Sequence, residues 1–294
     1  MKNMCFIINP RSGKVRIKNA LLDVLQIFGE AGYRVDVRVT QHIGHAIEIA
    51  QGISDNVDVV AVSGGDGTLN EVLTGLLKSE KNIPVGYIPT GSTNDFAATF
   101  GISTEPKRAA MQLVSGERVK VDVGKFGSER YFSYIASFGM FTAVSYNTPQ
   151  NVKNVFGHLA YVLEGVKDIT NICPYDVTIE ADGKTYEGRY IFGSITTSTS
   201  VGGIVKFDKS LVSINDGLFE IVLVKYPANI MELHKIVKGC ASSDFSDDMF
   251  EFIKAKNVKL TFDKEMDWSV DGEHQKAGKI IEIENLMQAA TIIR

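Results

Sequence analysis

The strongest constraint on the fold is a change of sequence pattern close to residue 126. Before it, short apolar runs alternate with helical segments such as 17–28, where apolar residues recur at intervals of three and four. After it, runs rich in β-branched and aromatic residues follow one another with turns between them, as in 176–195 and 216–226. Alternating strands and helices favour a parallel sheet covered by helices on both faces, whereas successive strands favour an antiparallel sheet.

We therefore predict two domains. Residues 1–126 are expected to form an α/β domain with a parallel sheet and helices on both faces. Residues 127–294 are expected to form a mostly antiparallel, β-sandwich-like domain. It is expected to be interrupted by one helical insert near 157–169 and by a pair of helices between 229 and 255. A chain of 294 residues is long enough for this division, because single hydrophobic cores stop growing at roughly 250 residues.

Net charge, apolar segments and cysteine spacing restrict the possible binding partners and the cellular location of the protein. The formal net charge is −4, which lacks the positive field expected of a nucleic-acid binder, so we predict no nucleic-acid partner. The first ten residues do not form a signal peptide, and no window reaches the ~18 apolar residues of a membrane-spanning helix. We therefore expect a cytoplasmic protein. Its three cysteines lack metal-binding spacing and are expected to be reduced thiols.

The most informative segment is SGGDGTLNEV, residues 63–72, which follows the apolar strand 57–62 and leads into a helix. Its glycines can adopt backbone angles closed to other residues and turn several N–H groups toward one point. The positive end of the helix dipole adds to their attraction for an anion. A tight strand-to-helix turn is the simpler interpretation, but one glycine would suffice for it. The segment predicts a phosphate site that is neither a P-loop nor a dinucleotide fingerprint.

Further motifs extend this segment into a pattern that covers nearly the whole chain. They are NPRSGK at 9–14, Thr40 with GHA at 44–46, GGDGTLNEV at 64–72, GSTNDFA at 91–97, VDVG at 121–124, NDGLFE at 215–220 and DGE at 271–273. In this order they resemble the soluble bacterial diacylglycerol kinases, a group of lipid kinases related to sphingosine kinases and NAD kinases. GGDGT alone would indicate phosphoryl transfer from a nucleotide without naming the acceptor.

The resemblance implies a two-domain fold of the NAD kinase and diacylglycerol kinase type, with ATP in the cleft between the domains. The positions that match its nucleotide-binding residues are Asn9, Thr40, Gly64, Gly65, Asp66, Gly67, Thr68, Leu69, Asn70, Ser92, Thr93 and Asn94. Asp66 also matches a catalytic position. With Asp95 and Asp122 it is expected to form an acidic network, which a cation or Lys14 would have to compensate.

The resemblance also implies a Mg²⁺ site in the second domain. Asp216 matches an acidic ligand, and Ser213 and Leu218 match positions that supply backbone carbonyls. Oxygen ligands of this kind suit a hard cation such as Mg²⁺. Without the resemblance, NDG at 215–217 would be interpreted as a turn before a strand. Whether the ion is structural or catalytic stays open at this point.

Glu273 matches the general base of the family. It follows Asp271-Gly272, and this pair, like Asp182-Gly183, is a strong signal for a two-residue hairpin turn. A hairpin tip could present the Glu273 carboxylate to a substrate hydroxyl, while Asp271 is expected to shape the turn. A solvated hairpin charge is the simpler alternative.

Together these features predict an ATP-dependent lipid kinase that phosphorylates a hydroxyl of diacylglycerol or a related lipid at a membrane surface. It would be a peripheral protein at the inner face of the membrane, with the segment 147–158 as one candidate contact, and a homodimer stays open. The alternatives are an NAD kinase or other small-molecule kinase, and a catalytically silent nucleotide- or lipid-binding protein of the same fold. The sequence does not specify the lipid.

Overall fold

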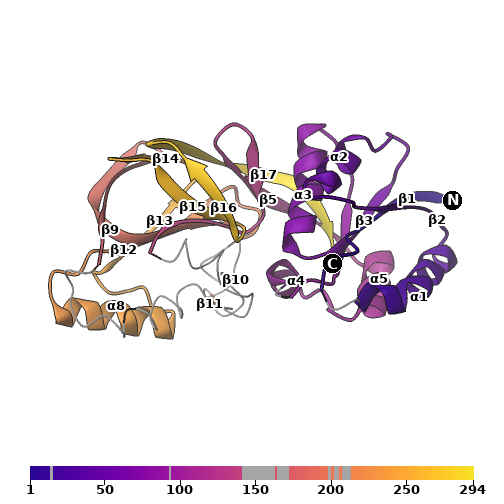
Figure 1. Cartoon of the computed structure of the whole chain (residues 1–294), viewed down its shortest axis with the longest axis horizontal. Coiled ribbons are helices and arrows are strands. Elements are labelled where there is room, and N and C mark those ends of the chain that lie inside the picture. The colour runs from indigo at the N-terminus through magenta and orange to yellow at the C-terminus, as the bar shows by residue number, and fades with distance from the viewer. Residues whose placement is uncertain are drawn as a thin grey trace. The chain divides into compact units, whose positions relative to one another are not determined.

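The protein divides into two compact units. Unit 1 comprises residues 1–122 and 288–294, and unit 2 comprises residues 123–287. The computed structural model describes residues 1–13, 16–92, 94–140, 163, 172–197, 200–201, 205–206 and 213–294 (Figure 1). Outside the described residues lie the candidate membrane segment 147–158 and most of the expected helix at 157–169. The same holds for Thr93 of the expected nucleotide site and for Lys14, the expected partner of the acidic network.

Unit 1 is built on a parallel sheet. Its strands are β1 (Lys2–Ile8), β2 (Tyr33–Val39), β3 (Val59–Gly64) and β4 (Val85–Pro89), in the order β2-β1-β3-β4. Every residue of β3 and β4 is buried, as expected for parallel strands that are covered on both faces.

In the described part of unit 1 five helices accompany these strands, namely α1 (Arg16–Glu30), α2 (His45–Gln51), α3 (Asp66–Lys78), α4 (Asp95–Phe100) and α5 (Pro106–Ser115). Figure 1 shows α2 and α3 on one face of the sheet and α1 and α5 on the other. The predicted parallel sheet with helices on both faces is therefore confirmed.

The strand order identifies the edge of the sheet where a ligand is expected. From β1 the chain moves to β2 on one side, and it then returns to place β3 on the other side of β1. The connections therefore change direction between β1 and β3. In open α/β sheets, ligands bind outside the carboxyl ends of the strands at such a switch point.

Unit 2 is an antiparallel assembly. Its strands include β6 (Arg130–Phe132), β7 (Ile135–Gly139), β8 (Tyr175–Ala181), β9 (Lys184–Thr196), β12 (Phe219–Lys225), β13 (Phe250–Ala255), β14 (Asn257–Phe262), β15 (Met266–Val270) and β16 (Glu273–Ala277). The path runs β16-β15-β7-β9-β8-β14, and β12 pairs with both β9 and β13. The short pair β10 (Ser200–Val201) and β11 (Val205–Lys206) forms a separate ribbon. The predicted antiparallel second domain is confirmed.

Both predicted hairpin turns are present. Asp182 and Gly183 have φ values of 45° and 83°, and Asp271 and Gly272 have φ values of 48° and 80°. Positive φ at both central residues is what a type I′ turn requires, and Asp-Gly is a favoured pair for it. The turns join β8 to β9 and β15 to β16.

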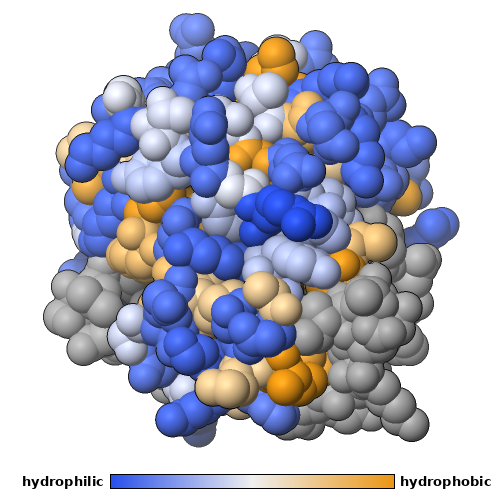
Figure 2. Space-filling model, turned by 90° about the vertical axis from the view of Figure 1, so that its left-hand side faces the viewer, coloured by the Kyte–Doolittle hydropathy of each residue, from blue (hydrophilic) through white to orange (hydrophobic). Residues whose placement is uncertain are grey.

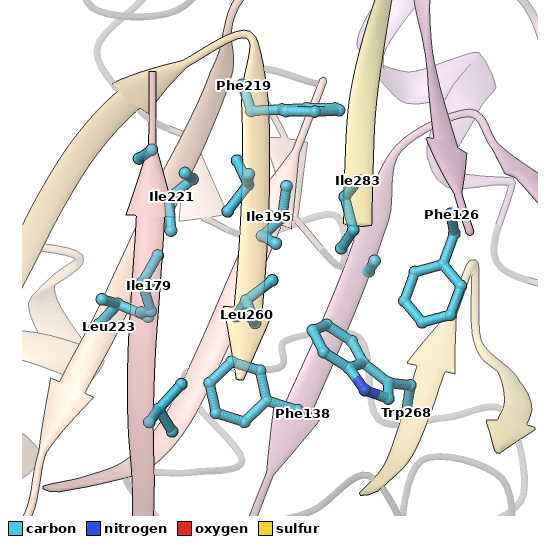
Figure 3. Close-up of a cluster of buried hydrophobic side chains, with 14 of the residues drawn as sticks. Phe126, Phe138, Ile179, Ile195, Phe219, Ile221, Leu223, Leu260, Trp268 and Ile283 are labelled. Atoms are coloured by element: carbon cyan, nitrogen blue, oxygen red, sulfur yellow. The ribbon is translucent and has the colours of Figure 1, made fainter. Parts of the chain in front are cut away.

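An aromatic cluster fills the centre of unit 2 (Figure 3). The Trp268 indole lies against Phe126, Phe138 and Phe262, with ring centroids 5.0, 5.1 and 6.0 Å away. Residues of β12 alternate between two cores, because Ile221 and Leu223 face this cluster while the intervening valines face a second one. That second core includes α8 (Ile230–Ser242), whose first turn is capped by the Asn229 side chain. Of the two helices expected between 229 and 255, α8 is present, whereas the end of this stretch forms β13, which pairs with β12.

Strand β17 (Ile280–Ile293) has residues in both units, as does β5 (Arg118–Phe126). The sequence pattern placed all of β17 in the second domain. Residues 288–294 belong to unit 1 instead, because Ile292 and Ile293 pair in parallel with β4 and the Gln288 N–H donates to Asp122 Oδ1 at 2.7 Å. Gln288 itself has a φ of 52°, which marks a local change of backbone direction.

We expect Trp268→Ala to lower the free energy of unfolding of unit 2 by about 3–5 kcal/mol, the usual cost of truncating a large buried aromatic residue. Trp268 is fully buried in the aromatic cluster. Ile280→Ala is the control, because Ile280 is 56% exposed and its loss should change stability by less than about 0.5 kcal/mol. Urea denaturation followed by circular dichroism measures both. Equal losses in the two variants would contradict the assignment of Trp268 to the core.

Candidate functional site

The segments that follow β1, β3 and β4 are hydrogen-bonded to one another at the switch point. The Asn9 N–H donates to Ser63 O at 2.8 Å, and its side-chain Nδ2 donates to Thr68 Oγ1 at 2.9 Å. Gly64 O accepts from the N–H groups of Thr90 and Gly91 at 2.8 and 3.2 Å. Three sequence-distant motifs therefore meet through their backbones at one edge of the sheet.

Two glycines are required by the close approach of these segments. At Gly13, with φ 62°, an added Cβ would lie 1.8 Å from Thr90 O, which no side chain could accommodate. At Gly91, an added Cβ would lie 2.6 Å from Gly65 Cα. The glycines of NPRSGK and GSTNDF thus allow backbone to meet backbone.

Gly65 differs from these two glycines. An added Cβ there would lie 3.5 Å from Gly91 Cα and 3.7 Å from Ser12 Oγ, which are ordinary van der Waals distances. Its backbone is extended, with φ −90°, so a side chain is also conformationally acceptable. The surrounding protein therefore does not explain why this position is glycine, whereas a ligand packed against the loop would.

Helix α3 begins in this loop with an uncapped N-terminus. Gly65 is its N-cap and no side chain caps the first turn, which leaves the N–H groups of Asp66, Gly67 and Thr68 without a side-chain acceptor. Unpaired donors together with the helix dipole favour an anion here. Leu69 differs from its neighbours: its N–H donates to Gly65 O and its side chain is in the core, so it supports the turn.

Asp66 connects α3 to α4. Its carboxylate oxygens accept from the N–H groups of Asp95 at 3.0 Å and Phe96 at 3.2 Å, and so it caps the first turn of α4. Burial raises the pKa of Asp66 although these hydrogen bonds oppose the change. The Asp66 carboxylate thus contacts the backbone of Asp95, and the Asp122 carboxylate accepts from the Gln288 N–H. The expected network of the three carboxylates stays a prediction.

Glu71 has a matching role that the sequence did not reveal. Its carboxylate accepts from the N–H groups of Gly44 and Ala46 at 3.0 and 3.3 Å, which caps the start of α2. Helix α3 therefore carries two carboxylates that each cap a neighbouring helix. Its position in GGDGTLNEV was the one feature of the sequence that pointed to Glu71. Its partners could not be inferred from the motif, because they lie 25 and 27 residues away.

The remaining predicted nucleotide residues of unit 1 surround the same edge. Thr40 is buried at the end of β2, and its N–H donates to Ile8 O at 2.9 Å. Asn94 is buried in a left-handed conformation, with Nδ2 donating to Gly91 O at 3.0 Å. Ser92 is exposed, and Asn70 is buried within α3. The structure thus brings the described members of the predicted set to one edge of the sheet.

In unit 2, residues 213–218 form a polar turn just before β12. Asp216 is exposed, and its Oδ1 accepts from the Leu218 N–H at 3.1 Å. Gly217, with φ 80°, allows the turn, and Ser213 Oγ donates to Asn215 Oδ1 at 3.1 Å. The predicted ligands Ser213, Asp216 and Leu218 thus lie in one short loop, in which the atoms that could bind a metal ion are oxygens.

Glu273 begins β16 and is paired with an arginine. Arg130 Nη2 lies 2.6 Å from Glu273 Oε2, and the Glu273 side chain is 52% exposed. The sequence did not single out Arg130, because it lies 143 residues from Glu273.

Asp271, two residues before Glu273, fixes the turn as expected. Its buried carboxylate accepts from the N–H groups of Ser133, Tyr134 and Ile135 and from the Ser133 hydroxyl, at 2.7 to 3.1 Å. Burial raises the pKa of Asp271 to about 6, against the opposing effect of these donors. The hairpin that carries Glu273 is therefore attached firmly to the start of β7.

Two histidines and a glutamate form a small cluster on the surface of unit 1. Potential ligand atoms of His42, His45 and Glu48 lie within 4.8 Å of one another, and the two imidazole rings are stacked. The Gln41 N–H donates to His45 Nδ1 at 3.0 Å, which engages one nitrogen of this group. We assign no function to this surface cluster.

Comparison with known proteins agrees with the geometry of both units. Residues 3–126 match the family model of the diacylglycerol kinase catalytic domain, and residues 135–284 match that of the YegS C-terminal NAD kinase beta sandwich-like domain. A diacylglycerol kinase of Bacillus subtilis is 34% identical over 277 residues, which cover 93% of this chain and 90% of the relative. One of Staphylococcus carnosus is 33% identical over 275 residues, covering 93% and 89%. The chain belongs to the bacterial diacylglycerol kinase family.

Members of this family are lipid kinases of lipid metabolism, and membership implies the use of ATP. The fold agrees as well. One solved structure from Bacillus anthracis superposes with a TM-score of 0.85 at 25% identity, covering 99% of this chain and 95% of the other. A second, described as a diacylglycerol kinase from the same organism, gives 0.77 at 23% identity, covering 99% and 96%, which shows the fold alone. The resemblance seen in the sequence motifs is thus confirmed.

The geometry of Gly65 leads to a prediction. Gly65→Ala should leave the melting temperature nearly unchanged, because its methyl group meets only ordinary contacts, but it should weaken ATP binding about 10- to 100-fold. This range corresponds to the loss of one or more charge-assisted hydrogen bonds to a phosphate. Gly29→Ala in α1, where an added Cβ meets nothing within 4 Å, is the control. Isothermal titration with ATP gives the Kd values, and an unchanged Kd for Gly65→Ala would place the phosphates elsewhere.

Proposed function

We propose that this protein transfers the γ-phosphate of ATP to a hydroxyl of diacylglycerol or a related lipid at a membrane surface. The observation that supports this most directly is the uncapped N-terminus of α3 at the β1/β3 switch point, next to a glycine that the protein itself does not require. Family membership supplies the class of reaction.

On the nucleotide side, the proposed phosphate ligands are the N–H groups of 65–68, with Asn9, Thr40, Ser92 and Asn94 around them. An acidic residue in the first turn of α3 would repel a phosphate if its charge faced the ligand. The Asp66 carboxylate accepts instead from α4, so its charge is partly neutralised and its direction is fixed. We propose that Asp66 holds the loops after β3 and β4 in register and contributes to catalysis through that arrangement.

Magnesium is proposed at two places. With ATP, Mg²⁺ would neutralise charge on the phosphates during transfer. In unit 2, the Asp216 carboxylate and the carbonyls of Ser213 and Leu218 would hold a second ion. The donor set fits Mg²⁺, because the loop offers carboxylate, carbonyl and amide oxygens, and Glu220 places a buried carboxylate at the end of the same motif.

Glu273 is proposed as the general base of the reaction. Phosphoryl transfer passes through a loose transition state, so the protein mainly positions the hydroxyl and accepts its proton late. The Arg130 ion pair holds Glu273 Oε2, and Asp271 fixes the turn that carries it. The other oxygen of Glu273 would then receive the proton.

Contact with the membrane is proposed to be peripheral. Among the described helices, none has the length and apolar character needed to cross a bilayer. Figure 2 shows one face of the molecule, on which hydrophilic residues predominate and hydrophobic ones are interspersed. In unit 2, Ile230 and Met231 at the start of α8 are exposed apolar side chains that a lipid surface could cover.

An NAD kinase remains the second candidate, because the matched model for residues 135–284 is described as NAD kinase beta sandwich-like. Labelled ATP should be incubated with the protein and separate acceptors, namely micellar diacylglycerol, phosphatidylglycerol, ceramide, sphingosine, undecaprenol and NAD. We expect labelled product with at least one lipid and none with NAD. Transfer to NAD alone would refute the lipid kinase assignment, and transfer to no acceptor would favour a silent binding protein.

Glu273→Gln tests the proposed base. The substitution keeps the size of the side chain but removes the proton acceptor, and loss of a general base usually lowers rate by about 10²- to 10⁴-fold. The Kd for ATP should be unchanged, because the proposed phosphate ligands lie in unit 1. Glu265→Gln, another glutamate of unit 2, is the control. A kcat equal to that of the wild type would make Glu273 a surface charge held by Arg130.

A further inference from the structure

Glu220 in β12 is an unusual carboxylate. Its side chain is 0% exposed, and neither of its oxygens has a hydrogen-bond partner. Among the described residues, the one cation near it is Lys254, whose Nζ lies 3.4 Å from Oε1 and whose side chain is 36% exposed. A buried carboxylate normally accepts several hydrogen bonds, because burying an unpaired charge is strongly unfavourable.

The position of Glu220 in the strand explains its burial. Phe219 and Ile221 on either side point into the aromatic core. Glu220 therefore points to the opposite face, on the side of Val222 and the second core. Opposite it in the neighbouring strands are Thr196 of β9 and Lys254 of β13.

The lysine does not fully compensate this charge. Its Nζ lies 3.4 Å from Oε1 and forms no hydrogen bond with either oxygen. The negative charge of Asp216 also acts on the Glu220 carboxylate. Because the Asp216 carboxylate acts on Glu220, the two acidic groups are electrostatic neighbours. Like charges near each other are disfavoured unless a cation lies with them.

Glu220 lies two residues beyond Leu218, whose carbonyl belongs to the proposed cation site. The NDGLFE motif thus brings a solvent-exposed carboxylate, backbone carbonyls and a buried carboxylate to one end of β12. A hard divalent cation takes six or more oxygen ligands in the case of Ca²⁺ and keeps several waters in the case of Mg²⁺. A second carboxylate on the protein side of such an ion would supply the charge that Asp216 alone lacks.

We propose that Glu220 is the buried carboxylate of the divalent-cation site at Asp216, and that it binds the ion directly or through one of its waters. This inference rests on the proposed function of the 213–218 loop. Lys254 stabilises the Glu220 carboxylate while the ion is absent, and the bound ion takes over that role. Lys254 is therefore a competitor of the ion rather than its ligand.

The test measures Mg²⁺ binding without nucleotide, so that only ions held by the protein contribute. Isothermal titration with MgCl₂ gives the Kd, and the melting temperature with and without Mg²⁺ gives an independent readout. The variants are Glu220→Gln, Asp216→Asn and Lys254→Met. Glu251→Gln is the matched control, because Glu251 in β13 is a partly buried carboxylate that pairs with Lys225 Nζ at 3.2 Å.

We expect Glu220→Gln to weaken Mg²⁺ binding about 10- to 100-fold, the usual effect of removing a close partner of a metal site, and to reduce the Mg²⁺-induced rise in melting temperature. Lys254→Met should lower the melting temperature without Mg²⁺ and increase the rise on adding it. Glu251→Gln should leave the Kd for Mg²⁺ unchanged. If Glu220→Gln does not fold, Glu220→Asp keeps the charge with a shorter side chain and should show the same weakening to a smaller degree.

The outcomes distinguish a failure of the proposed cation site from a failure of the proposed role of Glu220. If the wild-type protein shows no Mg²⁺ binding and no Mg²⁺-dependent melting, the proposed cation site itself fails. If Asp216→Asn loses Mg²⁺ binding but Glu220→Gln and Glu220→Asp retain the wild-type Kd, the site stands and the role of Glu220 is refuted. Glu220 would then be the buried half of an ion pair with Lys254.

Discussion

Backbone segments in unit 1 approach each other so closely at the carboxyl ends of β1, β3 and β4 that side chains would prevent their contact. The Gly64 carbonyl accepts from two N–H groups of the loop after β4, and Gly13 and Gly91 pack against backbone atoms of neighbouring loops. This arrangement leaves the first turn of α3 uncapped at the switch point of the sheet. The position of the proposed nucleotide site follows from this backbone contact more than from any single side chain.

Carboxylates that accept backbone N–H groups hold the surrounding elements in place. Asp66 caps α4 and Glu71 caps α2, both from helix α3. In unit 2 the two Asp-Gly turns use the same device, because Asp182 accepts from the N–H groups of Lys256 and Asn257, and Asp271 accepts from 133–135. Each of these acids satisfies donors that would otherwise be unpaired, so each joins segments that are distant in sequence.

A second group of acids does not join the backbones of sequence-distant segments. Glu273 is partly exposed and held by one arginine, Asp216 is exposed on its loop, and Glu220 is buried beside one lysine. These carboxylates have capacity to interact with a substrate hydroxyl or a cation, whereas Asp271 has its oxygens occupied by four donors. The contrast distinguishes acids that build the fold from acids that are candidates for chemistry.

The sequence by itself determined the features that depend on a few neighbouring residues. The change of pattern near residue 126 predicted a parallel and an antiparallel part, and Asp182-Gly183 and Asp271-Gly272 predicted their turns, because helical periodicity, strand alternation and positive φ are local requirements. The motif order also identified the family. The roles of the predicted site residues stay predictions, although the described members of the nucleotide set do lie at one edge of the sheet.

Only the tertiary structure decided which distant groups meet. Residues 288–294 belong to unit 1 because the end of β17 pairs with β4. Glu71 caps the first turn of α2, and Arg130 pairs with Glu273, which lies 143 residues away in the sequence. The structure also showed that Glu220 is buried without a hydrogen-bond partner in a strand whose alternation predicts only that it faces away from Phe219. Periodicity specifies which face a side chain takes. What covers that face depends on long-range packing, which no short stretch of sequence contains.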